Sequence, residues 1–138
     1  MTGERCRSLL GDQRVARLAT VGPGGPRIVP ITFALVADRI VTAIDDKPKT
    51  TTRLRRLTDI ANNPRVAVLA DHYEEDWERL WWVRADGIAE VHHSGDAMEG
   101  AIDQLSARYP QYRQRRPEGP VIAITVTQWS GWSAEERT

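Results

Sequence analysis

The protein has 138 residues, of which 41% are hydrophobic and 28% are charged, as expected for one soluble globular domain spanning residues 1–138. Its 19 Lys and Arg residues balance its 19 Asp and Glu residues, which argues against a nucleic-acid partner. The single cysteine, Cys6, excludes an internal disulfide, and the sequence has neither a membrane-spanning apolar run nor a secretory signal. We therefore expect a cytoplasmic protein without a membrane partner.

The first third of the chain predicts a short helix followed by a hairpin. Residues 3–11 read as the helix, which Gly11 ends. Strands are expected over residues 15–21 and 27–35, because Gly22-Pro23-Gly24-Gly25 between them has turn chemistry. Pro30 removes one ladder donor, so the second strand should lie at an edge or carry a bulge.

The middle of the chain continues this antiparallel pattern after a second tight turn at Asp38-Arg39. A third strand is predicted over residues 39–44, and helical spacing of apolar residues predicts a helix over 50–62. Strands are expected over 65–70 and 80–91, with Gly87 marking a bulge or close approach.

The last third predicts one more helix and one more strand. Ser94 is a suitable N-cap for an amphipathic helix that Pro110 ends, residues 111–118 read as a polar loop, and 121–127 read as the final strand. Six short strands with tight turns indicate a mainly β fold, a six-stranded antiparallel barrel with flanking helices.

Three motifs carry little chemistry. The Gly22–Gly25 turn lacks the spacing of a phosphate loop. His92 and His93 are adjacent on a strand, so they point to opposite faces and do not form a recognised metal site. Cys6 has no paired base in the sequence, which favours an inert thiol.

A basic segment at the start of the 50–62 helix is the strongest candidate site. Helix N-termini present free N–H groups and partial positive charge, and arginines grip phosphate with two hydrogen bonds. The segment therefore suits an anion, although a solvated helix face with a threonine cap would have the same composition. The candidate residues are Lys47, Lys49, Thr50, Thr51, Arg55 and Arg56.

A tryptophan-rich segment is the second candidate. Strand alternation puts Trp82 and Arg84 on one face and Trp81 and Val83 on the other. A flat apolar wall beside an arginine suits an aromatic, anionic ligand. A dimer interface or core packing is the alternative, because tryptophan is common at both.

The order of these segments resembles the split-barrel flavin and deazaflavin proteins, the pyridoxamine 5′-phosphate oxidase-like superfamily. It looks most like the small actinobacterial coenzyme F-420-dependent oxidoreductases. The resemblance runs from about Arg14 to Trp132 and is carried by residues 17–20, 26–33, 55–60, 63–66 and 81–87.

The resemblance implies an FMN-binding split-barrel fold and a homodimer with the cofactor in a groove at its interface. The family's phosphate-binding basic pair would fall on Arg55 and Arg56, and Lys47, Lys49, Thr50 and Thr51 would extend the positive groove. Residues of the second strand would lie near the ring, and two tryptophans would border the substrate. These further cofactor-binding residues are Pro30, Ile31, Thr32, Trp81 and Trp82.

The function implied is hydride transfer between reduced coenzyme F-420, an 8-hydroxy-5-deazaflavin, and a small organic acceptor. The cofactor carries the chemistry, so the protein need only bind, orient and exclude water, and the sequence names no catalytic residue. Two alternatives stay open. The same fold could hold FMN as an oxidase or reductase, or it could bind F-420 or haem without turnover.

Overall fold

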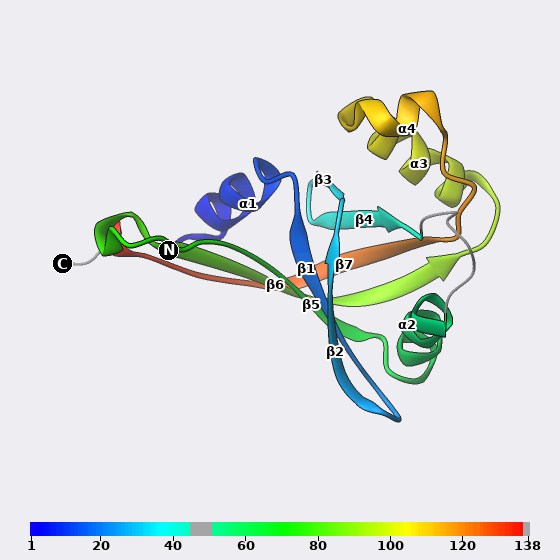
Figure 1. The fold of residues 1–138 in the computed structure, drawn as a ribbon, viewed down its shortest axis with the longest axis horizontal. Coiled ribbons are helices and arrows are strands. Elements are labelled where there is room, and N and C mark those ends of the chain that lie inside the picture. Colours follow the sequence, from blue (N-terminus) through cyan, green and yellow to red (C-terminus); the bar gives the residue numbers. More distant parts are fainter. Residues whose placement is uncertain (45–50, 137–138) are drawn as a thin grey trace.

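The computed structural model describes residues 1–44 and 51–136, without the side chains of residues 51–54 and 136. It is built on a single antiparallel sheet with helices packed around it (Figure 1). The expected helix at the N-terminus is present as α1 (Gly3–Gly11), and the Thr2 hydroxyl caps it by accepting the Arg5 N–H at 3.1 Å.

The described part of the sheet has seven strands in the order β2-β1-β5-β6-β7-β4-β3. The antiparallel, mainly β prediction is confirmed, and the prediction of six strands is wrong. The strands are β1 (Ala16–Gly22), β2 (Gly25–Ile31), β3 (Ala34–Val36), β4 (Arg39–Ala43), β5 (Arg65–His72), β6 (Trp81–His92) and β7 (Val121–Ser133).

The extra strand arises because the predicted strand 27–35 is interrupted at Thr32 and Phe33. The Tyr109 hydroxyl accepts the Phe33 N–H at 3.0 Å and can donate to the Phe33 carbonyl at 2.8 Å. The Thr42 hydroxyl donates to the Thr32 carbonyl at 2.7 Å. Side chains thus form hydrogen bonds with the backbone N–H and carbonyl groups that would otherwise pair with a neighbouring strand. The chain then leaves β1, and β3 pairs with β4 instead.

The two edge strands, β2 and β3, do not pair with each other in the described ladders, so closure into a barrel stays a prediction. Both predicted tight turns are confirmed by the pairing of Gly22 with Gly25 and of Val36 with Arg39. Pro30 lies on an edge strand, as its missing donor required.

The glycine in β6 marks a bulge, as predicted. The register between β6 and β7 shifts between Asp86 and Gly87. A Cβ atom at Gly87 would lie 2.5 Å from the Thr125 carbonyl oxygen, so only glycine allows the strands to approach this closely.

The last strand is longer than predicted, because β7 continues past Thr127 to Ser133 by pairing with the start of β6. Residues 71–82 and 132–136 form an extension that we call the distal arm. Figure 1 shows it projecting from the rest of the sheet.

The remaining helices are α2 (Thr51–Asn62), η1 (Trp77–Arg79), α3 (Asp96–Arg108), α4 (Pro110–Gln114) and η2 (Ala134–Glu136). Gly95, not the predicted Ser94, is the N-cap of α3. The predicted polar loop over 111–118 contains α4, because Pro110 suits the first position of a helix as well as ending the previous one.

The core divides into two clusters on the two sides of β7. Ile122 and Ile124 pack with the inner faces of β1, β5 and β6, while Val121 and Ala123 pack against α3. The inner face of the sheet is thus closed by its own strands together with α1 and α2. The opposite, outer face of β1, β5 and β6 is left without a covering element among the described residues, and the candidate site lies there.

Candidate functional site

A groove of about 500 Å³ lies on the outer face of the sheet, within the size range of small-molecule pockets. The side chains of β1, β5 and β6 that line it point outward, because successive side chains of a strand alternate between its two faces and the intervening ones fill the core. The floor is apolar, and it is made by Ala19, Ala67, Leu69 and Ile28.

Aromatic and basic side chains surround this floor. Trp82 and Tyr73 supply two rings from the arm side, and Arg17 and Arg84 supply two cations. Arg84 is held by an ion pair with Asp86 at 3.3 Å, while Arg17 is exposed. Asp71 also lines the groove, so its rim carries charges of both signs, and Arg17 is the cation without a carboxylate partner among the described residues. The flat apolar floor suits an aromatic ring, and Arg17 could pair with a negative group on it.

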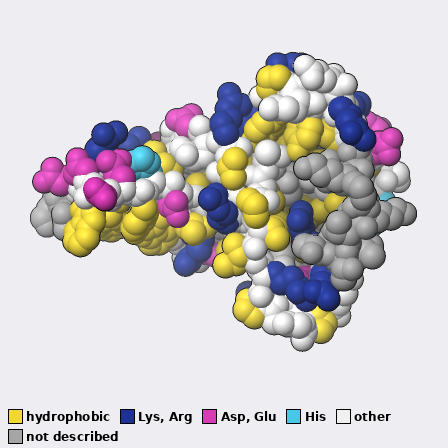
Figure 2. Space-filling view, viewed as in Figure 1, with side chains coloured by type: hydrophobic (Ala, Val, Ile, Leu, Met, Phe, Trp, Pro, Cys, Tyr) yellow, Lys and Arg dark blue, Asp and Glu magenta, His cyan; other side chains and the backbone are white. Residues whose placement is uncertain are grey.

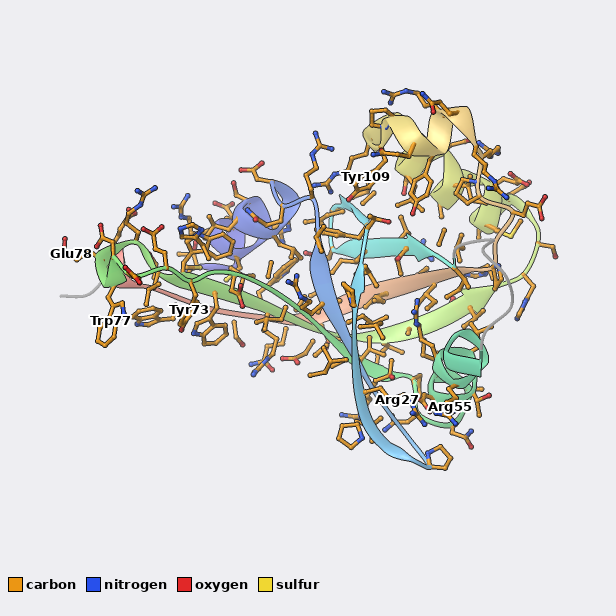
Figure 3. The ribbon with its side chains drawn as sticks, in the orientation of Figure 1. Arg27, Arg55, Tyr73, Trp77, Glu78 and Tyr109 are labelled. Carbon is orange, nitrogen blue, oxygen red and sulfur yellow. The ribbon has the colours of Figure 1, made fainter. Side chains whose placement is uncertain are left out.

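Hydrophobic side chains continue from the groove along the arm. Figure 2 shows charged side chains on one side of the arm and hydrophobic ones along the other, and Figure 3 shows Tyr73 and Trp77 pointing to that hydrophobic side. Trp77 is 74% exposed and Ile28 is 70% exposed. A contiguous apolar surface of this kind marks an interaction site.

A second basic centre lies where the β1–β2 hairpin packs against α2. Arg27 donates to the buried Asp59 carboxylate at 2.9 Å, and the Thr20 hydroxyl donates to the same oxygen at 3.1 Å. A Cβ atom at Gly22 would lie 1.8 Å from the other Asp59 oxygen, so the glycine lets the helix approach the hairpin. Asp59 therefore fixes α2 against β1 and β2.

The two arginines predicted to bind phosphate lie on this same helix. Arg55 precedes Asp59 by four residues, which puts both on one side of α2, and Figure 3 labels Arg55 and Arg27 at this end of the molecule. Arg56 is half-buried, and its Nε is buried without a hydrogen-bond partner in the described part of the chain. Burial lowers the pKa of the Arg56 guanidinium from its usual value.

Arg27, Arg55 and Arg56 outnumber the single carboxylate of Asp59. A buried guanidinium nitrogen without an acceptor is costly, and an anionic oxygen would relieve that cost. This part of the structure therefore fits a phosphate group, and the outer groove fits a planar ring.

The other predicted cofactor residues fall in different places. Ile31 is buried in the core, Pro30 is exposed on the outer side of β2, and Thr32 contacts α4 rather than the groove. Trp81 packs against the core and Trp82 lines the groove, which confirms the predicted alternation. Lys47, Lys49 and Thr50 lie outside the described residues, and Thr51 begins α2 without a described side chain.

Sequence reasoning missed Arg17, Arg27 and Tyr73. Arg17 alternates with buried Ala16 and Leu18, so the period of the strand could have put it outward with Arg84. Arg27 and Tyr73 had no such signal, because their positions depend on the packing of α2 and on the arm.

Comparison with known proteins identifies the family. The model of the pyridoxamine 5′-phosphate oxidase family matches residues 2–133. The chain belongs to this family. No match to a curated protein was found.

Solved structures similar to this chain share its fold, and those with a described ligand bind different ones. A FAD-binding protein from Mesorhizobium loti is 22% identical with a TM-score of 0.74, over 95% of this chain and 94% of that one. A conserved hypothetical protein from Mycobacterium tuberculosis is 21% identical with a TM-score of 0.73, over 98% and 86%. A heme binding protein from Mycobacterium smegmatis is 20% identical with a TM-score of 0.75, over 97% and 55%.

The TM-scores and the family match support a shared flavin-binding split-barrel fold. Sequence identities this low do not assign a ligand to this chain. Among the described residues, no helix is both long and apolar enough to cross a membrane. The expected cytoplasmic location stays a prediction.

Proposed function

We propose that the protein is a homodimeric oxidoreductase that uses coenzyme F-420 to reduce a small organic acceptor. The observation that carries the proposal is the buried Nε of Arg56, which lacks an acceptor in the described chain and lies on the same helix as Arg55 and the Arg27–Asp59 pair. An anionic ligand that accepts a hydrogen bond from this half-buried guanidinium would bind more tightly for that reason.

The residues divide the work of binding between two surfaces. Arg55, Arg56 and Arg27 would hold a phosphate, while Trp82 and the apolar floor of the outer groove would orient a ring. When bound, the deazaflavin supplies hydride chemistry. The protein's own contribution is to fix the ring against the sheet and to exclude water from it, as the apolar groove lining allows.

The exposed apolar face supports the homodimer. Ile28, Val21, Tyr73 and Trp77 are all more than two-fifths exposed, which is unfavourable for a free monomer. A second copy that covers this face would bury them and turn the open groove into an enclosed site. Sedimentation of the purified protein would give a dimer, and Trp77→Ser would weaken it.

The smaller cofactor FMN is the rival flavin ligand, since it needs one phosphate site and one ring site. FAD-binding and other flavin-fold neighbours support that reading equally at the level of the fold. The extra cations Lys47 and Lys49 favour the longer, more acidic tail of F-420, and they lie outside the described residues.

Haem binding without turnover is the rival of a different class, and heme-binding neighbours favour it. The three histidines differ in how available they are to iron. His72 Nε2 is engaged by Glu74, so iron would have to displace that contact. His92 Nε2 is buried without a hydrogen-bond partner among the described residues and lies 3.5 Å from a Glu90 oxygen, and His93 is exposed.

Titration of the apo protein with F-420, FMN and haem tests all three readings. We expect the tightest binding for F-420, and Arg55→Ala and Arg56→Ala should each weaken it about tenfold, the loss typical of a charge-assisted hydrogen bond. Arg39→Ala removes an exposed cation outside the candidate site and should leave binding unchanged.

Each competing result has a definite meaning. Tighter binding of FMN moves the function to the flavin branch, and a Soret band that titrates to one haem per chain moves it to haem binding. No binding of F-420 at micromolar concentration contradicts the proposal. So does equal loss in Arg39→Ala and Arg56→Ala.

A further inference from the structure

A larger groove, of about 650 Å³, lies at the corner where α3 and α4 meet the end of β2. It shares no lining residue with the outer-face groove. Arg14 and Val15 contribute from the segment before β1, Thr32 from the end of β2, and Tyr109 and Tyr112 from the α3–α4 junction. Figure 3 shows Tyr109 under the α3–α4 pair, far along the molecule from Tyr73 and Trp77.

The floor of this corner groove is held in a fixed position. The Tyr109 hydroxyl lies within hydrogen-bond distance of the Phe33 N–H and carbonyl and can donate to the Arg14 carbonyl at 2.9 Å. The Tyr109 and Tyr112 rings meet edge to face, with centroids 5.6 Å apart. Because these contacts join three segments far apart in the sequence, the ring surfaces are ordered before any ligand arrives.

The groove keeps hydrogen-bonding capacity that its own contacts do not use. The Thr32 and Tyr112 hydroxyls lie 2.6 Å apart, so one donates to the other. The accepting hydroxyl keeps its own hydrogen, and that hydrogen has no acceptor within the pair. One polar donor therefore remains available beside the apolar ring surfaces and Val15, which is 46% exposed.

The charge of the lining is positive. Arg14 donates one N–H to the Arg108 carbonyl at 3.0 Å, and its guanidinium lies 5.8 Å from the centre of the Tyr109 ring. The guanidinium has further N–H groups in a planar fork that matches a carboxylate. No carboxylate stands among the described residues that line the groove, so a ligand would supply the negative charge.

We propose that this corner groove binds a planar aromatic carboxylate. The ligand ring would lie against Tyr112 and Val15, which the buried Tyr109 holds in place from beneath. The carboxylate would pair with Arg14, and the free hydroxyl of the Thr32–Tyr112 pair would donate to the ligand. The inference rests on the corner alone and holds whichever cofactor occupies the outer face.

Calorimetric titration of the full chain with 2-naphthoate tests this, with neutral 2-naphthamide as the matched ligand. We expect saturable binding of one naphthoate per chain and at least tenfold weaker binding of the amide, because only the acid pairs with Arg14. Amide NMR shifts on titration should concentrate at residues 14–15, 32 and 109–112.

Two variants and a control locate the site. Arg14→Gln should weaken naphthoate binding about tenfold and abolish the preference for acid over amide. Tyr112→Phe keeps the ring and should weaken both ligands by a similar, smaller factor. Arg115→Gln removes a cation from the same corner that does not line the groove, and it should leave both affinities unchanged.

Three results would overturn the inference. One is equal affinity for acid and amide in the native protein. Another is shifts concentrated on β1, β5 and β6 instead of the corner. The third is displacement of naphthoate by saturating F-420 or FMN, which would make the corner part of the cofactor site. Failure of F-420 to bind in a separate titration affects only the proposed function.

Discussion

Two partly buried arginines, one on each of the two long helices, have opposite surroundings. Arg108 at the end of α3 donates to the carbonyls of Phe33 at 3.1 Å and Gly11 at 2.9 Å and also to that of Gln13. Its guanidinium also lies 4.9 Å from the centre of the Phe33 ring. Arg56 on α2 has a buried Nε without any partner in the described chain.

The comparison separates a structural arginine from a binding one. Around Arg108 the fold supplies backbone acceptors from the end of α1, from the segment after it and from the β2–β3 connection, so the side chain joins these segments to α3. On α2, the carboxylate of Asp59, three residues after Arg56, is already paired with Arg27 and Thr20. Arginine therefore stabilises the fold at position 108, whereas at position 56 it keeps a hydrogen-bond donor for which we propose a ligand.

The largest expected effect on stability is at Arg108. Arg108→Ala removes a donor from three backbone carbonyls, of which the Phe33 carbonyl can still accept from the Tyr109 hydroxyl, so we expect it to lower the free energy of unfolding by about 3 kcal/mol. Urea unfolding followed by far-UV circular dichroism measures this. Arg108→Lys keeps the charge without the planar fork and should lose an intermediate amount. Wild-type stability in Arg108→Ala would break the comparison.

The second prediction is a neutral or stabilising effect at Arg56. Arg56→Met keeps the length of the side chain and removes a buried charge that nothing in the described chain compensates. We therefore expect a free energy of unfolding equal to wild type or higher by up to about 1 kcal/mol, together with weaker F-420 binding. A loss of more than about 1 kcal/mol by the same urea measurement would show that Arg56 has a structural partner after all.

The smallest expected effect depends on pH and concerns the clamp between α1 and the β3–β4 turn. Arg7 pairs with Asp38 at 2.6 Å, and the Trp129 indole N–H donates to the same oxygen at 3.1 Å. Hydrogen bonds from Arg7 and then Trp129 lower the pKa of Asp38 from its ordinary value near 3.8. A lowered pKa means that the clamp stabilises the fold above pH 4 and is lost as the pH falls through the lowered value.

Thermal melts of wild type and Asp38→Asn test this clamp. Wild type should melt at a higher temperature at pH 7, and the difference should shrink as the pH falls below the ordinary pKa of aspartate and disappear below the lowered pKa of Asp38 in the folded protein. The pair is exposed, so added salt should reduce the difference at neutral pH. A difference that grows toward acid pH would contradict the assignment.

The sequence determined the local structure of this protein well. Gly22–Gly25 specified a hairpin, the period of β6 put Trp82 outward and Trp81 inward, and Gly87 marked the bulge. These features depend on residues within a few positions of one another, where turn chemistry and strand period act directly. The basic character of α2 was also visible without any structure.

Only the tertiary structure decided how these elements share their polar groups. Tyr109 breaks the predicted strand 27–35 from 76 residues away, and Asp59 on α2 takes Arg27 from 32 residues away. On the same helix, Arg56 Nε has no acceptor in the described chain. The physical reason is that a hydrogen-bond donor is satisfied by whichever acceptor packing brings near, and no local pattern in a sequence records which distant group that will be.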